Sequence, residues 1–326
     1  MSVTCEPERH PRAAATPRRS LMAAAVAAPV LAGATAGAAR AASPGPVQPV
    51  PTVLDDWTDV GSALGRRGNM NRGLIYRASF PRLDLRVVCQ RVTVTPELAL
   101  GSHVGFIRYA DGSTMMMGDL TVTEREMAGV LAPLHEHGVE TTAIHKHLPA
   151  HSTDVWWIHA HAHGHDPVPL ARAVRAAIDA TGTPPPGTPP PEQPLDLDTA
   201  GLDAALGARG TVYGDVYKFV LVRREQIVRA GLALPPGLGS TTALNFQPVG
   251  SGRAAFAGDF VMVADEVLEV LTLLGRGGIR IVTLHNHDLR EDPRLFFVHL
   301  WAVDDAVRIG RALRPALDVT NVEPVG

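Results

Sequence analysis

The chain has 326 residues, of which 45% are hydrophobic and 19% charged, and its formal net charge is −3 at neutral pH. This composition is typical of a globular protein with one large domain or two of ordinary size, and it excludes collagen, a coiled coil and wholesale disorder. A mildly acidic chain without a basic run is poor material for contact with nucleic acid or anionic lipid, so we expect neither as a partner.

The first forty residues have the features of an export signal. The pair Arg18–Arg19 precedes an alanine-rich apolar run over 21–39, and a small-x-small peptidase site ends at Ala41. This pattern predicts a signal peptide over 1–41, and the paired arginines favour the twin-arginine route. Because the run is weakly hydrophobic and interrupted by proline and glycine, no stable membrane span is expected. We therefore expect a protein exported to the cell envelope or the exterior.

A flexible segment is expected over 42–55, followed by a domain over 56–181. Its elements alternate between short strands and helices with one apolar face. Helices are expected at 57–64, from Glu126 to a cap at Gly138, and at 167–180; strands are expected at 73–80, 85–94, 103–109, 114–122, 139–147 and 155–161.

The second half of the chain repeats the first. Gly118–Asp119 aligns with Gly258–Asp259, and nine of the thirty positions over 118–147 are identical to their partners, against about two expected by chance. We call 56–181 copy 1 and 198–326 copy 2. The prolines between them predict a stiff linker over 182–197. The pattern predicts an α+β fold: two tandem, pseudo-twofold related copies of a mostly antiparallel sheet with helices on one face.

Each copy carries three histidines at matching positions. They are His145, His147 and His159 in copy 1, and His285, His287 and His299 in copy 2. Residues i and i+2 of a strand share a face about 7 Å apart, and the next antiparallel strand can bring the third histidine beside them. Three converging imidazoles predict an open site for zinc or another divalent transition metal in each copy. The alternative is a structural role, in which the histidines brace the loop between two strands.

Four acidic residues are candidates for assisting such a site. Asp119 and Asp259 could orient a metal-bound imidazole, or could instead form turns at strand ends. Glu126 and Glu266, each at a helix start, could be a fourth ligand or a general base beside a metal-bound water. The alternative for the two glutamates is a favourable interaction with the helix dipole.

Other catalytic signatures are absent from the sequence. It has no nucleophile elbow, no Walker loop and no dinucleotide fingerprint after a strand, so no nucleotide cofactor is expected. Only Cys89 remains after signal removal, which excludes an internal disulfide. These patterns favour a metal-dependent hydrolase. The alternatives are an envelope protein that binds a metal, a small molecule or an envelope component without turnover, and a structural repeat module.

The pattern Gly-Asp…Glu…Gly-Ile…His-Asn-His…Pro-Arg…His over 258–299, with a looser copy over 118–159, resembles the LppY/LpqO lipoprotein family. This is a bacterial family of unknown function, usually with two such segments, and the resemblance covers nearly the whole mature chain. It implies a repeat architecture and export, and no particular chemistry. The chain departs from the family in having Lys146 within its first His-x-His, no Pro-Arg pair in copy 1 and no lipoprotein cysteine.

Overall fold

A computed structural model of the chain describes residues 45–187 and 194–325. The predicted signal peptide and the middle of the predicted linker lie outside the described residues. Among the helices of the described part, none is long and apolar enough to cross a membrane.

Copy 1 is built on a six-stranded antiparallel sheet. A 3-10 helix, η1 (Leu54–Trp57), and α1 (Thr58–Leu64) precede it. The strands, in spatial order, are β1 (Asn69–Asn71), β2 (Ile75–Pro81), β5 (Gly101–Arg108), β6 (Thr114–Thr123), β9 (Val155–Gly164) and β7 (Glu140–His145). The helices α2 (Met127–Glu136) and α3 (Pro167–Asp179) pack on one face of this sheet through an apolar core.

Copy 2 has the same order of elements. It begins with α4 (Thr199–Leu206). Its strands, in spatial order, are β10 (Thr211–Tyr213), β11 (Val216–Arg223), β14 (Thr241–Gly250), β15 (Arg253–Val263), β18 (Leu295–Asp305) and β16 (Arg280–His285), with β19 (Val322–Pro324) paired to β11. The helices α5 (Ala264–Arg276) and α6 (Ala306–Asp318) cover one face. The expected α+β fold of two similar copies is confirmed.

The single strand expected over 85–94 is instead a hairpin of β3 (Val87–Cys89) and β4 (Val92–Val94). Gln90 and Arg91 both have positive φ, 47° and 72°, which is the backbone of a tight two-residue hairpin turn. The hairpin pairs with β8 (His151–Ser152). In copy 2, β12 (Val228–Arg229) pairs with both β13 (Leu232–Ala233) and β17 (Glu291–Asp292).

These hairpins lie in two arms, residues 85–100 (arm 1) and 225–240 (arm 2), and each arm packs on the sheet of the other copy. In arm 1, the Thr95 amide donates to Gln247 Oε1 at 3.1 Å, and Gln90 Oε1 accepts from Trp301 Nε1 at 3.0 Å. In arm 2, the Ala233 carbonyl accepts from the Tyr109 hydroxyl at 3.1 Å. An apolar cluster surrounds the contacts of each arm. The arms therefore tie the two copies into one core.

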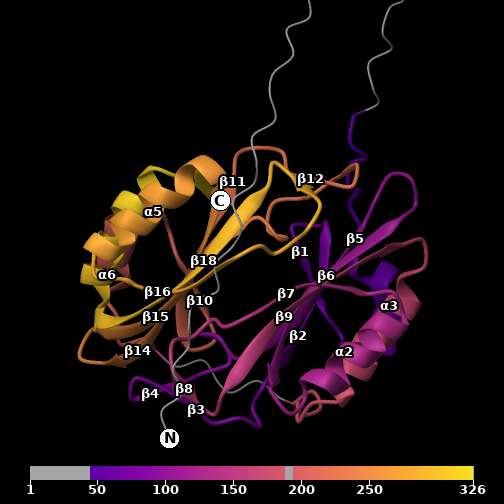
Figure 1. The fold of residues 1–326 in the computed structure, drawn as a ribbon, viewed down its shortest axis with the longest axis horizontal. Coiled ribbons are helices and arrows are strands. Elements are labelled where there is room, and N and C mark those ends of the chain that lie inside the picture. The colour runs from indigo at the N-terminus through magenta and orange to yellow at the C-terminus, as the bar shows by residue number, and fades with distance from the viewer. Residues whose placement is uncertain (1–44, 188–193, 326) are drawn as a thin grey trace, which may run out of the picture. The chain divides into compact units, whose positions relative to one another are not determined.

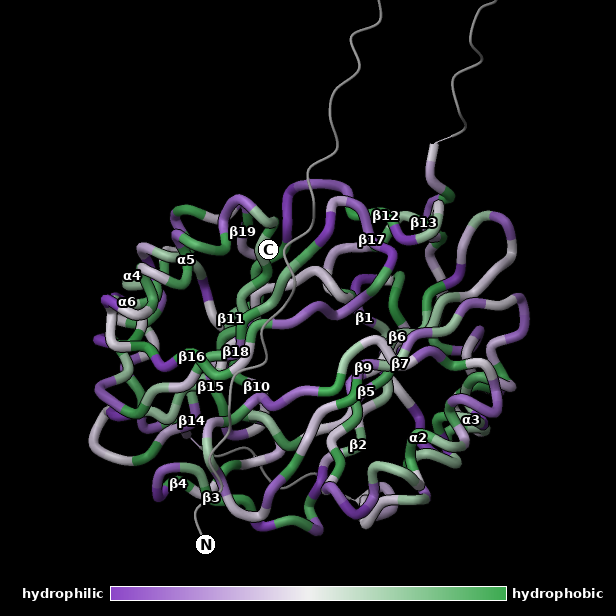
Figure 2. The backbone as a smooth tube through the Cα atoms, in the orientation of Figure 1, coloured by the Kyte–Doolittle hydropathy of each residue, from purple (hydrophilic) through white to green (hydrophobic). Residues whose placement is uncertain are grey.

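The sheets turn their helix-free faces toward each other. Figure 1 shows α2 and α3 on one outer side, α5 and α6 on the opposite side, and both sheets between them. Figure 2 shows hydrophobic residues along strands such as β2 and β11 and hydrophilic residues gathered in the loops. We call the helix-free face of each sheet its inner face, and it is this face that carries the histidines.

Part of the segment predicted to be flexible, 42–55, is fixed by backbone hydrogen bonds. The Val47 amide donates to the Gly231 carbonyl at 2.8 Å, and the Val50 amide donates to the Arg108 carbonyl at 2.9 Å. Within the described residues 45–55, these bonds attach the segment to arm 2 and to β5. Arm 2 and the end of β5 offer unpaired backbone groups to this segment, and the local sequence does not reveal those partners.

Candidate metal centre

Strand register places an aspartate beside a histidine at the middle of each sheet. Asp119 on β6 lies opposite His159 on β9, and Asp259 on β15 lies opposite His299 on β18. Leu120 follows Asp119 and belongs to the helix-side core, so alternation turns Asp119 to the inner face. Both aspartates lie within long strands, and the alternative interpretation of them as strand-end turns is wrong.

The His-x-His motifs lie where an edge strand ends. The strands β7 and β16 end at His145 and His285. His147 and His287 therefore lie beyond the strands, although the sequence had predicted that the strands include them. The opposite copy holds each of these turns. Thr142 Oγ1 donates to the His287 carbonyl at 2.6 Å, and Thr283 Oγ1 donates to the Lys146 carbonyl at 2.8 Å.

The six histidines form one cluster between the sheets. The structure brings the two predicted triads together at one place. The rings of His145 and His285 stack with centroids 3.8 Å apart, which places them on either side of the pseudo-twofold axis. Two further pairs of distances agree with this symmetry, whereas His145–His299 at 5.0 Å and its equivalent His285–His159 at 5.9 Å differ. His147–His299 is 3.8 Å and its equivalent His287–His159 is 4.1 Å. His145–His159 and His285–His299 are both 4.8 Å.

The potential ligand atoms of the cluster approach one another closely. His145 Nε2 lies 3.1 Å from both His299 Nε2 and His147 Nε2. Asp119 Oδ2 lies 3.4 Å from His147 Nε2, and Asp259 Oδ2 lies 3.3 Å from His287 Nε2. In a tetrahedral zinc site with bonds of about 2.1 Å, two ligand atoms are about 3.4 Å apart. These separations therefore fit ligands that share an ion.

Four groups of three side chains each have ligand atoms within 4.8 Å of one another. They are His145–His159–His285, His145–His147–His299, His285–His287–His299 and Asp119–His147–His159. The predicted triad of copy 2 is one of these groups. The predicted triad of copy 1 is not, because His145 groups with histidines of copy 2 and Asp119 replaces it beside His147 and His159.

Burial keeps the imidazoles neutral. The pKa of each of the six histidines is lowered, first by burial and, for five of them, also by neighbouring histidines; that of His299 falls to about 3. Burial raises the pKa of Asp119 and Asp259, and the charge of Asp259 raises that of Asp119 further. Neutral imidazole is the form that binds metal ions.

Several polar atoms of the cluster are buried without a hydrogen-bond partner among the described residues. They are Asp119 Oδ1, His145 Nδ1, His159 Nε2, Asp259 Oδ1, His285 Nδ1, His285 Nε2 and His287 Nε2. Buried polar atoms of folded proteins nearly always have a partner, and leaving one without costs about 1–3 kcal/mol. Such a concentration at one place indicates a bound group that satisfies these atoms.

Glu126 and Glu266, predicted as ligands or general bases, belong to none of the four groups and pair with arginines instead. Arg82 donates to both Glu126 carboxylate oxygens at 2.9 Å, and Arg223 pairs with Glu266 in the same way. Each glutamate also accepts from a backbone amide at the start of its helix, Thr123 at 2.8 Å and Val263 at 3.0 Å. Each glutamate thus links a buried arginine to the start of a helix.

The inner faces carry three further polar groups that the sequence did not predict as site residues. Arg77 on β2 and Lys218 on β11 occupy matching positions, directly after Tyr76 and Tyr217. His103 on β5 lies opposite Asp119. A basic residue within an otherwise apolar strand, repeated in both copies, is the signal that could have identified the first two.

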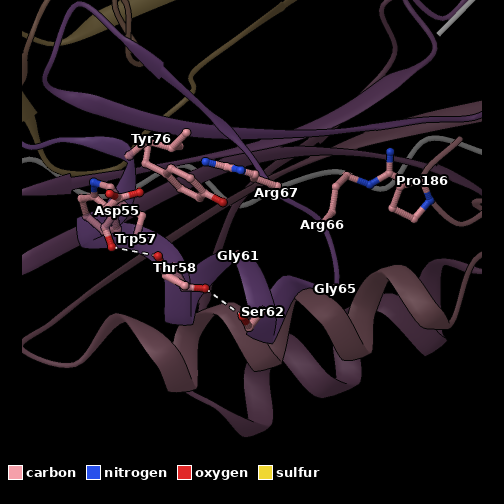
Figure 3. Close-up of a pocket in the computed structure, with 11 residues that line it drawn as sticks. Asp55, Trp57, Thr58, Gly61, Ser62, Gly65, Arg66, Arg67, Tyr76 and Pro186 are labelled. Atoms are coloured by element: carbon pink, nitrogen blue, oxygen red, sulfur yellow. Dashed lines mark hydrogen bonds between the residues drawn. The ribbon is translucent and has the colours of Figure 1, made fainter. Parts of the chain in front are cut away.

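A separate hollow of about 500 Å³ lies on the helix side of copy 1. Figure 3 shows Trp57, Tyr76, Arg66 and Arg67 among the residues that line it. Trp57 and Tyr76 belong to the helix-side core, and no histidine of the cluster lines this hollow. It is therefore distinct from the candidate metal centre.

Two solved structures match the chain at low similarity. A double-ringed trimeric shell protein of the RMM microcompartment shares 12% identity with a TM-score of 0.18, and the match covers 63% of this chain and 82% of that one. The trimeric bacterial microcompartment shell protein PduB shares 12% identity with a TM-score of 0.20, over 77% of this chain and 92% of that one. Matches at these TM-scores support no conclusion about fold or function. No curated protein matches the chain.

One protein family matches both copies. Residues 58–180 and 200–319 each match the domain described as Domain of Unknown Function (DUF1259). The two matched ranges coincide with the internal repeat found in the sequence and with the two sheets of the structure. The chain therefore belongs to the DUF1259 family and contains two tandem copies of its domain.

Proposed function

We propose that the protein binds divalent transition-metal ions of the zinc class at the histidine cluster, with ligands from both copies. The observation that carries this proposal is the set of buried ring nitrogens and carboxylate oxygens of the cluster that lack hydrogen-bond partners among the described residues. Ligand atoms of the same cluster approach one another to 3.1–3.4 Å, the spacing of ligands that share an ion. Neutral imidazole with carboxylate is a donor set typical of zinc and similar ions. The structural alternative leaves these buried atoms unsatisfied and is therefore disfavoured.

The cluster has enough ligands for two ions. Six imidazoles and two carboxylates exceed the four ligands of one tetrahedral site. The pseudo-twofold axis between His145 and His285 also relates every group on one side to a group on the other. We therefore propose up to two ions per chain, and at least one.

We further propose that the bound metal supports hydrolysis. A zinc-class ion lowers the pKa of a bound water to about 7 and so supplies a nucleophile at neutral pH. The His147 and His287 side chains are 16% and 12% exposed, so water can reach the cluster at these two side chains. Asp119 and Asp259, next to these two histidines, are placed to orient an imidazole or to accept a proton.

Metal content tests the first proposal. We expect purified protein to retain at least one zinc-class ion per chain by plasma mass spectrometry, and a His145→Ala/His285→Ala variant to lose it while remaining folded by circular dichroism. A His135→Ala/His137→Ala variant is the matched control, because both of these histidines are exposed on or beside α2. A folded parent that holds no metal, even after zinc is added, would refute metal binding.

Hydrolysis needs a separate test, because the number of imidazoles also favours a protein that stores or sequesters metal without turnover. We expect the zinc-loaded protein to cleave some members of a panel of ester and phosphoester substrates. Activity should disappear after chelation and return with zinc, and Asp259→Asn should lower the activity per bound metal ion. Stoichiometric metal with no cleavage across the panel would favour the metal-binding alternative.

We also propose that the chain is exported and that it belongs, within its family, with the LppY/LpqO type. The paired arginines and the alanine-rich run of residues 1–41 support export, and the His-Asn-His and Pro-Arg segments of copy 2 support the narrower grouping. Expression with the native segment should yield envelope or secreted protein that begins near Ala42, and Arg18→Lys/Arg19→Lys should retain it in the cytoplasm.

A further inference from the structure

Two basic side chains from opposite copies lie on the inner faces without an acidic partner. Arg77 pairs with Gly105 in the sheet register, and a side chain added at Gly105 would contact Leu238 of arm 2. Lys218 pairs with Asn245 on β14, and Asn245 in turn pairs with Ala257 on β15. Ala257 belongs to the apolar cluster beneath arm 1. Both basic residues therefore point between the sheets. Neither forms a salt bridge within 45–187 or 194–325, and both are only partly exposed.

These two residues are electrostatic neighbours of each other and of the metal centre. Burial and then Arg77 lower the pKa of Lys218 to about 8, and burial, Arg77 and Lys218 lower the pKa of His103. His103 lies opposite Asp119 in register, and its charge in turn lowers the pKa of His287. The two basic side chains thus lie next to the candidate metal ligands, on the side of the cluster that carries Asp119 and His103.

The charge balance of this region calls for an anion. When Asp119 and Asp259 are ionised, as metal binding requires, they supply two negative charges, and Arg77 and Lys218 supply two positive charges. Each divalent ion at the cluster would add two more positive charges. An uncompensated charge that is shielded from bulk water costs free energy. We therefore expect an anion where the surplus positive charge is concentrated. The arginine fork matches two oxygens of a carboxylate or phosphate, and lysine adds a point charge.

We propose that Arg77 and Lys218 form a subsite for the oxyanion group, phosphate or carboxylate, of the molecule that binds at the metal centre. This inference rests on the proposed function, because the metal provides part of the charge surplus and the reacting end of the molecule. It narrows the substrate class to small anionic molecules. It also requires both copies, since one cation comes from each.

Lysine labelling of the unaltered protein tests the subsite directly. The chain has two lysines, Lys146 and Lys218. Lys146 binds Asp154 at 2.5 Å and lies 4.4 Å from the Trp156 ring centroid, so it is an internal control. We expect inorganic phosphate or acetate to slow acetylation of Lys218 by about tenfold, the effect of one charge-assisted hydrogen bond, and to leave Lys146 unchanged. The better protector identifies the oxyanion. Equal labelling of Lys218 with and without saturating anion would overturn the subsite.

Variants and metal content separate this inference from the proposed function. In zinc-loaded protein, Arg77→Met should weaken phosphate binding about tenfold by calorimetry at unchanged zinc content. Arg77→Lys should weaken it less, and Arg125→Met, an exposed arginine, should have no effect. Phosphate affinity that Arg77→Met leaves unchanged would mean that the anion binds the metal alone, and would overturn the subsite. A chain that holds no metal but whose Lys218 is still protected would refute the proposed function and support the subsite.

Discussion

The two copies agree at the cluster and differ around it. Both supply the His-x-His, the third histidine and the aspartate, and both hold a helix start with a buried arginine–glutamate pair. Around the cluster, Trp157 stacks on His147 at 4.3 Å in copy 1, whereas Phe297 stacks on His287 at 3.4 Å in copy 2. Copy 1 has His161 where copy 2 has Trp301.

This difference shows which positions the interface constrains. The cluster lies on the pseudo-twofold axis, so a change there affects both halves of the ligand set at once. His161 lies 3.3 Å from Asp288, which also pairs with Arg229, whereas Trp301 donates to Gln90 of arm 1. Each of these residues contacts a different segment of the other copy. Both copies therefore contribute the same residue types to the cluster, and they differ at the residues that contact the other copy.

The largest expected effect is the acid sensitivity of the metal-free protein. The six histidines have folded-state pKa values below the unfolded value of about 6.5, so they stabilise the fold above that pH and destabilise it as the pH falls. The raised pKa values of Asp119 and Asp259 act in the opposite direction, since acid relieves their buried charge. A net uptake of about four protons on unfolding corresponds to roughly 5 kcal/mol per pH unit. Urea unfolding at several pH values between 7.5 and 5 measures this slope.

Equivalent substitutions in the two copies sharpen that measurement. His159→Gln and His299→Gln should each flatten the slope by about 1.4 kcal/mol per pH unit, the contribution of one proton. His137→Gln, at an exposed position, should leave the slope unchanged. A slope that changes for only one of the two buried variants would contradict the equivalence of the copies at the cluster.

The next effect concerns the buried arginines. Arg82 and Arg223 have fully buried side chains, and each binds two carboxylates. Removing one partner of a buried ion pair costs about 3–5 kcal/mol, so Arg82→Ala and Arg223→Ala should lower the free energy of unfolding by similar amounts. Chemical denaturation of zinc-loaded protein provides the measurement.

The acidic partners of these arginines distinguish a structural role from a catalytic one. We expect Glu126→Gln and Glu266→Gln to lower stability by about 1–2 kcal/mol and to leave metal content and hydrolysis unchanged at temperatures where the protein is folded. Loss of bound metal in either variant at unchanged stability would show that the glutamates take part in metal binding.

Local sequence patterns predicted the elements of each copy but not how the copies meet. The strands expected at 103–109, 114–122 and 155–161 correspond to β5, β6 and β9, because apolar alternation and turn residues are local signals. The turn at Gln90–Arg91 has no glycine or asparagine, so the hairpin there was read as one strand. The apolar residues of the arms predict that the arms are buried, but they do not show which of the two copies each arm packs against.

The same limit applies to the site. The internal repeat selected all six histidines and both aspartates, since their spacing is kept in two diverged copies. It could not show that they form one cluster, because ligand groups such as His145–His147–His299 arise only when the inner faces meet. Glu126 and Glu266 are also repeated in both copies, yet they pair with the buried arginines and belong to none of the ligand groups. A residue that is repeated in both copies occupies a position under constraint. The repetition alone does not distinguish a residue needed for folding from a residue needed for metal binding or catalysis.

The smallest expected effect tests the difference between the copies. Trp157 donates from Nε1 to the Ala99 carbonyl at 3.1 Å in addition to stacking on His147, whereas Phe297 only stacks on His287. Trp157→Phe should therefore cost about 1–2 kcal/mol through the lost hydrogen bond and volume, while the ring still orients His147 and metal content stays at the parent level. Loss of metal in this variant would show that the indole itself positions the copy 1 ligands, and the copies would then differ in ligation as well as in packing.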